Sequence, residues 1–96
     1  MPINTTSVTV TTTNTLLIPE GRGRRMVVFS NETGHQLHIG GVGMTATDGI
    51  PLEHKDRIII QQQHQNDYTP SQAWYGRTDT ASGPCIVTWA TEDSTD

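Results

Sequence analysis

The chain has 96 residues, of which 32% are hydrophobic, 5% aromatic and 17% charged, and its net charge at neutral pH is −4. This length fits a single domain with a thin apolar core, and the acidic balance argues against duplex nucleic acid as the main partner. No run of about 18 apolar residues occurs, so we expect no membrane span. Nor does the start of the chain show the basic and apolar blocks of a signal peptide. Cys85 is the single cysteine, which excludes an intrachain disulfide.

Residues 1–13 are rich in threonine and carry few apolar groups. Residues 7–11 alternate, which places Val8 and Val10 on one face of a strand. Two interpretations stay open: an arm that pairs with a neighbouring subunit, or an edge strand of its own domain. A short apolar strand over residues 16–18 follows, and Pro19 begins a turn after it.

The strongest predicted strand runs from Arg25 to Ser30 and is apolar on both faces, which predicts a central position in a sheet. A polar turn separates it from the strand Gln36–Ile39, in which Leu37 points inward and His38 outward. The run Gly40–Gly43 ends this strand, because glycine allows a positive φ or a bulge there.

Three further strands are expected in the second half, over residues 56–61, 73–77 and 85–91. A long glutamine-rich loop, 61–72, connects the first two of them. The last residues, 93–96, form an acidic tail, and residues 14–92 form a single β-domain.

Seven or eight short strands without a helical period predict an all-β fold, either a small antiparallel β-sandwich or a jelly-roll-like β-barrel, with a Thr-rich N-terminal arm. The alternation within each strand predicts which side chains supply most of the core: Val27, Phe29, Leu37, Ile39, Ile58, Ile60, Val87 and Trp89.

The residues with catalytic or metal-binding chemistry are scattered. His35 and His38 are three residues apart, so they point to opposite faces of a strand unless the turn bends between them. The glycine run at 40–43 lacks the Lys-Ser/Thr of a phosphate loop. Paired carboxylates, such as Asp48 with Glu53, suit glycosidases, but few aromatics are available to build a sugar cleft. We therefore expect no enzyme, no metal and no cofactor.

Six residues are candidates for a subunit or partner interface. Three interpretations stay open for Arg22 and Arg24: a phosphate-binding patch, a charged turn, or bidentate contacts with carboxylates of a partner. Trp74 and Tyr75, together with Trp89, fit either a platform on which a sugar stacks or the large side chains of a core or an interface. The candidates are Val8, Val10, Arg22, Arg24, Trp74 and Tyr75.

Four segments together resemble small virion proteins of tailed phages. They are 24–31, Leu37-His38-Ile39-Gly40-Gly41, Thr47-Asp48-Gly49-Ile50-Pro51-Leu52, and Ala73-Trp74-Tyr75-Gly76 followed by 85–92. The resemblance implies a β-sandwich or β-barrel module, often trimeric, on phage heads or at the base of spikes and fibres. Gly40, Gly41 and Gly49 would then form turns, and the loop 61–72 departs from the pattern by its length.

These features lead to an expected function. The chain is expected to be a virion structural protein that binds the capsid exterior as a decoration or cement subunit and stabilises the head. Its partners would be the major capsid protein or another virion protein, and further copies of itself, with a trimer favoured. One alternative is a tail, spike or fibre component, and a second is a carbohydrate-binding β-module.

Overall fold

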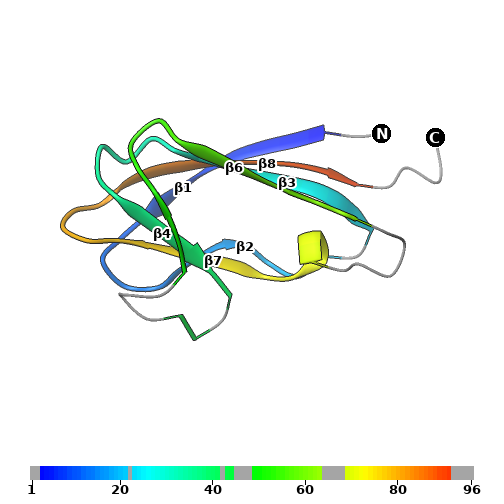
Figure 1. The fold of residues 1–96 in the computed structure, drawn as a ribbon, viewed down its shortest axis with the longest axis horizontal. Helices are drawn as coiled ribbons and strands as arrows, with labels where there is room; N and C mark the ends of the chain where they lie inside the picture. The colour runs from blue at the N-terminus through cyan, green and yellow to red at the C-terminus, as the bar shows by residue number, and fades with distance from the viewer. Residues whose placement is uncertain (1–2, 22, 42, 45–48, 64–68, 92–96) are drawn as a thin grey trace.

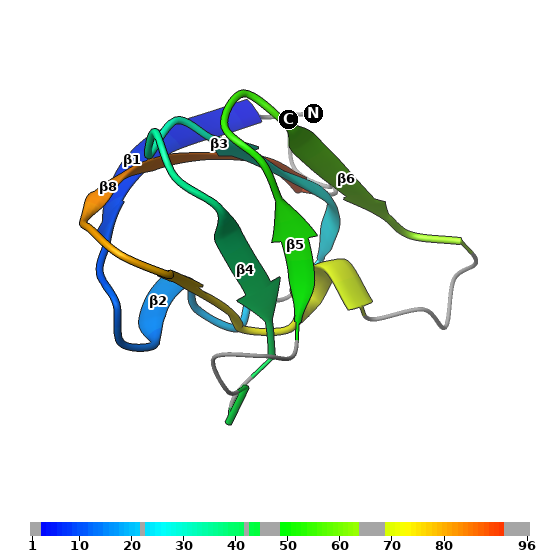
Figure 2. The same cartoon turned by 60° about the vertical axis from the view of Figure 1, so that its left-hand side comes forward.

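A computed structural model, describing residues 3–21, 23–41, 43–44, 49–63 and 69–91, shows two open antiparallel sheets packed face to face (Figures 1 and 2). Sheet A has the order β1 (Ile3–Val10), β8 (Gly83–Thr91), β3 (Arg24–Asn31) and β6 (Arg57–Gln61). Sheet B has the order β2 (Thr15–Ile18), β7 (Trp74–Thr78), β4 (Leu37–Gly40) and β5 (Ile50–Leu52). The predicted all-β fold is confirmed, as an open sandwich and not a closed barrel.

Strand β3 lies between β8 and β6, which confirms its predicted central position. Its side chains alternate, with Val27 and Phe29 buried between the sheets and Met26 and Val28 on the outer face. β-Branched and aromatic residues suit this pleated, half-covered environment. The strand is therefore apolar on both faces, although the described residues cover only one of them.

The core fills the space between the two sheets. Five of the eight predicted core residues are fully buried there, and the other three, Ile58, Ile60 and Trp89, are partly buried against it. The two isoleucines lie on β6, at one edge of sheet A, where the partner sheet covers them less completely. The buried cluster consists of Val10, Leu17, Ile18, Val27, Phe29, Leu37, Ile39, Leu52, Cys85 and Val87.

The N-terminal segment is an edge strand of its own sheet. Strand β1 pairs with β8 from Ile3 to Val10 in one continuous register. The side chain of Val10 has no exposed surface, so the end of this strand contributes directly to the core.

A 3-10 turn, η1 (Thr69–Ser71), is held against the start of β3 by Arg24. The guanidinium Nε donates to the carbonyl of Pro70 over 2.6 Å, and Nη2 donates to the carbonyl of Gln72 over 2.8 Å. Burial lowers the pKa of Arg24. The charge is compensated by two carbonyl dipoles, a common way to keep a buried polar group hydrogen-bonded.

The turn between β3 and β4 is built around Asn31, which is completely buried. Its Nδ2 donates to the carbonyls of His35 and Leu52, at 2.8 Å each. Gly34, at φ 82°, occupies the left-handed position of this turn, where a side chain would be strained. The Asn31 amide, at the end of β3 in sheet A, thus ties the turn to β5 of sheet B.

Candidate functional site

The sequence-predicted interface residues do not gather on one surface. Val8 and Val10 point toward the core, and Val10 is fully buried. Arg24 is also buried, with its donors directed to the carbonyls next to η1. The prediction that Val10 and Arg24 face a partner is therefore wrong, because the chain's own fold covers both side chains. Arg22 lies outside the described residues.

The aromatic residues are divided between the core and an outer face. The rings of Trp74 and Phe29 lie 5.7 Å apart and are tilted, and Trp74 Nε1 donates to the carbonyl of Thr69. Trp89 also packs against the core. Tyr75 pairs with Leu16 and Gly40 on the outer face of sheet B. These aromatics do not form one stacking platform, although a shallow groove lies beside Trp74.

The outer face of sheet A carries little charge along the rows that the strand register defines. Its cross-strand rows follow from the pairing of β1 with β8, of β8 with β3, and of β3 with β6. One row contains Ile3, Ala90, Met26 and Gln61; the next contains Thr5, Thr88, Val28 and Ile59; the third contains Ser7, Ile86, Ser30 and Arg57.

Two large apolar side chains on this face are strongly exposed: Ile3 is 68% exposed and Ile59 is 52% exposed. Between them, the hydroxyls of Thr5 and Thr88 lie 3.3 Å apart and share a hydrogen bond. Within the three rows, the only formal charge belongs to Arg57, on β6. A contiguous apolar and hydroxyl-bearing face of this kind is typical of an interaction surface.

The sequence contained a signal for this surface. Met26 and Val28 alternate with the core residues of β3, and Ile59 lies between two inward isoleucines of β6. Apolar residues on both faces of a strand indicate either a sheet that is covered on both sides or a sheet with one exposed apolar face that binds a partner. Only the arrangement of the layers shows that nothing in the described chain covers this side.

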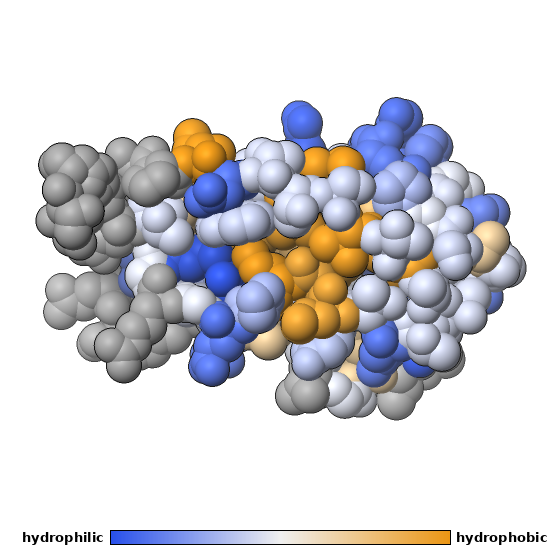
Figure 3. All heavy atoms as spheres, turned by 180° about the vertical axis from the view of Figure 1, so that it is seen from behind, coloured by the Kyte–Doolittle hydropathy of each residue, from blue (hydrophilic) through white to orange (hydrophobic). Residues whose placement is uncertain are grey.

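A second apolar area lies on the side of the sandwich formed by β1 and β2. Figures 1 and 2 place these two strands together, away from β6. Seen from that side, apolar atoms are exposed along the middle of the molecule between polar ones (Figure 3). Val8, on β1, is only partly buried, whereas Leu16, on β2, is 43% exposed on the outer face of sheet B, opposite Tyr75.

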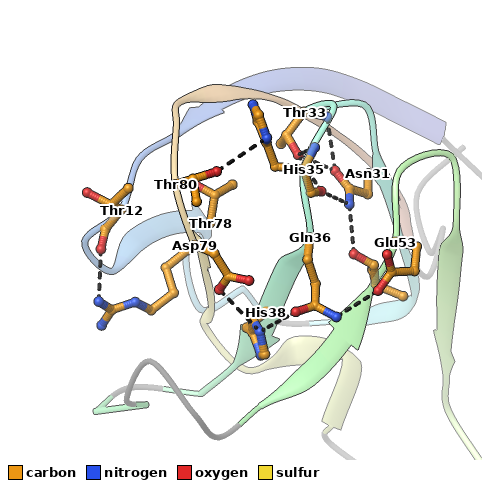
Figure 4. A network of polar contacts seen from close by, with 12 residues as sticks. Thr12, Asn31, Thr33, His35, Gln36, His38, Glu53, Thr78, Asp79 and Thr80 are labelled. Carbon is orange, nitrogen blue, oxygen red and sulfur yellow. Dashed lines mark hydrogen bonds and ion pairs between the residues drawn. The ribbon is translucent and has the colours of Figure 1, made fainter.

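The outer face of sheet B has a different, polar chemistry (Figure 4). His38 Nε2 lies 3.3 Å from Gln36 Oε1 and 3.5 Å from Asp79 Oδ1, and Gln36 Nε2 donates to Glu53 over 2.7 Å. His38 Nδ1 is buried and has no hydrogen-bond partner among the described residues. In the described part of the chain, this imidazole therefore does not link a carboxylate to a nucleophile, as a catalytic triad requires.

The other described histidines lie apart from His38. His35 Nδ1 lies 3.3 Å from the hydroxyl of Thr80, and His54 Nδ1 accepts a hydrogen bond from the backbone N–H of Gly34. His64 is outside the described residues. Among the residues that the structure describes, no three His, Cys, Asp or Glu side chains are grouped to hold a metal ion. In the same part of the chain, no helix is both long and apolar enough to span a membrane.

In comparisons with known proteins, no family model, no curated protein and no solved structure matches this chain. The protein class is defined by the structure itself, as a small antiparallel β-sandwich of two four-stranded sheets. Its most distinctive surface is the outer face of sheet A, where exposed apolar and hydroxyl side chains predominate.

Proposed function

We propose that this chain is a structural protein of a large protein assembly, and specifically a virion subunit that binds the capsid exterior as a decoration or cement protein. The observation that carries the proposal is the outer face of sheet A, with Ile3 and Ile59 exposed at either side of a surface of small apolar and hydroxyl residues. The choice of a virion as the assembly rests on the resemblance to small phage virion proteins.

The chemistry of this face suits a flat contact with another protein. A side chain such as Ile59 gains about 25 cal/mol for each Å² of apolar surface removed from water. The neighbouring threonines and serines can form hydrogen bonds at the contact without the cost of burying a charge. A standard protein–protein interface buries roughly 800 Å² on each partner. The two central strands of sheet A and their two neighbours offer a surface suited to such a contact.

The proposed mechanism is mechanical. Each copy would lie across neighbouring capsid subunits and oppose their separation, because the buried contact is lost when the subunits move apart. The partner would also stabilise the sandwich, since a ligand that binds only the folded state raises its stability. The resemblance further implies that copies associate with each other, often as trimers.

Two alternatives differ from this proposal, one in the position within the particle and the other in the binding surface. A tail, spike or fibre component would use the same outer face of sheet A but at another position in the particle. A carbohydrate-binding module would instead use the shallow groove beside Trp74, which Glu20, Gly41, Gln72 and Ala73 also line. Trp74 is only partly buried, so part of its indole can contact a sugar ring there.

The test is binding to purified particles from the protein's own source. The Ile59→Lys variant should lose co-sedimentation with the particles, because a desolvated charge would replace an apolar contact. Leu16→Lys, on the other sheet, is the matched control and should still bind. The proposal would be contradicted if both variants still bound the particles, or if the wild type did not bind them. Cryo-electron microscopy of the loaded particle separates a head position from a tail position.

A further inference from the structure

The four edge strands of the sandwich differ in how they are protected against pairing with another chain. Natural sheets protect their edges with short strands, prolines, charges or bulges. Strand β5 has three residues and contains Pro51. Strand β2 has four residues, an irregular register between Leu16 and Ile18, and Pro19 directly after it. Strand β6 has five residues and begins with Arg57.

Strand β1 has none of these protective features. Its eight residues, Ile3–Val10, contain no proline and no charged side chain, and their register with β8 is uninterrupted. Within the described chain, β1 pairs with β8 alone. In an antiparallel strand, alternate residues direct their N–H and C=O groups to opposite sides. The free side of β1 therefore presents a row of backbone donors and acceptors, and Ile3–Ser7 are all exposed.

We propose that β1 pairs antiparallel with β1 of a second copy of this chain. The pairing joins the two copies of sheet A, each with four strands, into one continuous sheet. A two-fold axis perpendicular to that sheet places one residue opposite itself, and near the middle of β1 this residue is Thr6 or Ser7. This inference does not depend on the proposed capsid function.

The composition of β1 is self-complementary. In either register, only threonine, serine, asparagine, valine and isoleucine face each other across the new pair. No like charges are brought together, although each chain carries a net charge of −4. Threonine pairs across antiparallel strands are favourable, and the Thr5–Thr88 hydroxyl contact already shows such a pair inside one copy.

A second observation favours a copy of the whole chain over an isolated extended peptide. Pairing at β1 turns the β1–β2 sides of the two copies toward each other. That side carries the exposed apolar area in Figure 3. A lone peptide strand would satisfy the edge of β1 but would leave most of this area in water. A second copy would cover both.

The first experiment is sedimentation velocity on the full-length protein from low to high micromolar concentration. The wild type should form dimers. Ser7→Lys places a charge at the middle of the pairing strand, opposite or diagonal to its symmetry mate, and should raise the dimer dissociation constant by about tenfold or more. Ile59→Lys puts the same charge on β6, at the opposite edge, and should leave the dimer intact. Melting temperatures of both variants confirm that each is folded.

Disulfide trapping gives an independent readout of the geometry. Mild oxidation should join Ser7→Cys into a covalent dimer, whereas Ile59→Cys should remain mostly unlinked. The native Cys85 is buried and does not compete. A wild type that stays monomeric, a trimer, a dimer that survives Ser7→Lys, or equal trapping of the two cysteine variants would each overturn the proposal. Particle binding is scored separately, through Ile59→Lys, so failure of the capsid function leaves this result unchanged.

Discussion

Thr33 donates both its backbone N–H and its hydroxyl to one oxygen, Oδ1 of Asn31, over 2.9 and 2.7 Å. The amide nitrogen of the same Asn31 donates to the carbonyls of His35 and Leu52. Both the oxygen and the nitrogen of the fully buried Asn31 carboxamide thus have hydrogen-bond partners. This arrangement connects the end of β3, the turn after it and strand β5, so one side chain couples the two sheets.

The first prediction tests this amide with a variant of nearly equal size. Asn31→Asp replaces two donated hydrogen bonds by an oxygen that faces two carbonyls, in a site without water access. The free energy of unfolding should fall by about 3 kcal/mol or more, measured by urea denaturation. Asn4→Asp is the control. The Asn4 side chain is exposed on the edge strand β1, so a carboxylate there stays in water and should change stability by less than about 1 kcal/mol.

The second prediction concerns the close approach of β8 to the β3–β4 turn. A Cβ at Gly83 would lie 2.6 Å from the Cα of Thr33 and 2.7 Å from its carbonyl oxygen. These are backbone atoms, so Gly83→Ala must displace the turn, and we expect a loss of roughly 1–3 kcal/mol in thermal or urea unfolding. Gly41→Ala meets nothing within 4 Å and should be nearly neutral. Equal effects of the two variants would contradict this account.

The third prediction tests the buried guanidinium of Arg24. Arg24→Lys keeps the charge but cannot direct two donors to the carbonyls of Pro70 and Gln72 at once. Stability should fall by about 1–3 kcal/mol, and protease sensitivity should rise around η1. The same exchange at the exposed Arg57 should leave both readouts unchanged. A variant as stable as the wild type would show that η1 is held by other contacts.

The fourth prediction follows from the burial of Cys85, which raises the pKa of its thiol to about 12. The thiolate is the reactive form, so a thiol reagent should label the native protein far more slowly at pH 8 than the urea-unfolded chain. The pKa of the Cys85 thiol is higher in the folded protein than the value near 8.5 in the unfolded chain. The contribution of this thiol to stability is therefore fully present below about pH 8.5. Its contribution is lost as the pH rises from about 8.5 toward 12. Rapid native labelling at pH 8 would contradict the burial of this thiol.

Much of the fold was predictable because it follows from local rules. Residues that alternate between apolar and polar define a strand, and glycine or proline define where it ends. For this reason the all-β class, the central position of β3 and the burial of Phe29 and Leu37 were predicted correctly. The short strand β5, at Ile50–Leu52, was not predicted, since three residues with a central proline carry no periodic signal.

The interface residues were harder to predict, because exposure is not a local property. Arg24 has the sequence signature of a surface cation, and only its contact with η1, more than 40 residues away, buries it. Ile59 has the signature of a core residue, yet it is exposed because its side chain lies on the outer face of sheet A, which no other described segment covers. The exposure of each depends on which distant segment packs against it.

The sequence by itself determined that this protein is built of short antiparallel strands with one apolar interior, because the two-residue period and the turn residues act over a few neighbouring positions. The tertiary structure decided the order of those strands within the two sheets, and with it which edges and faces remain open. The uncharged sequence of β1 could be read from the chain. Its place at a free edge arises only from long-range pairing with β8, some 80 residues away.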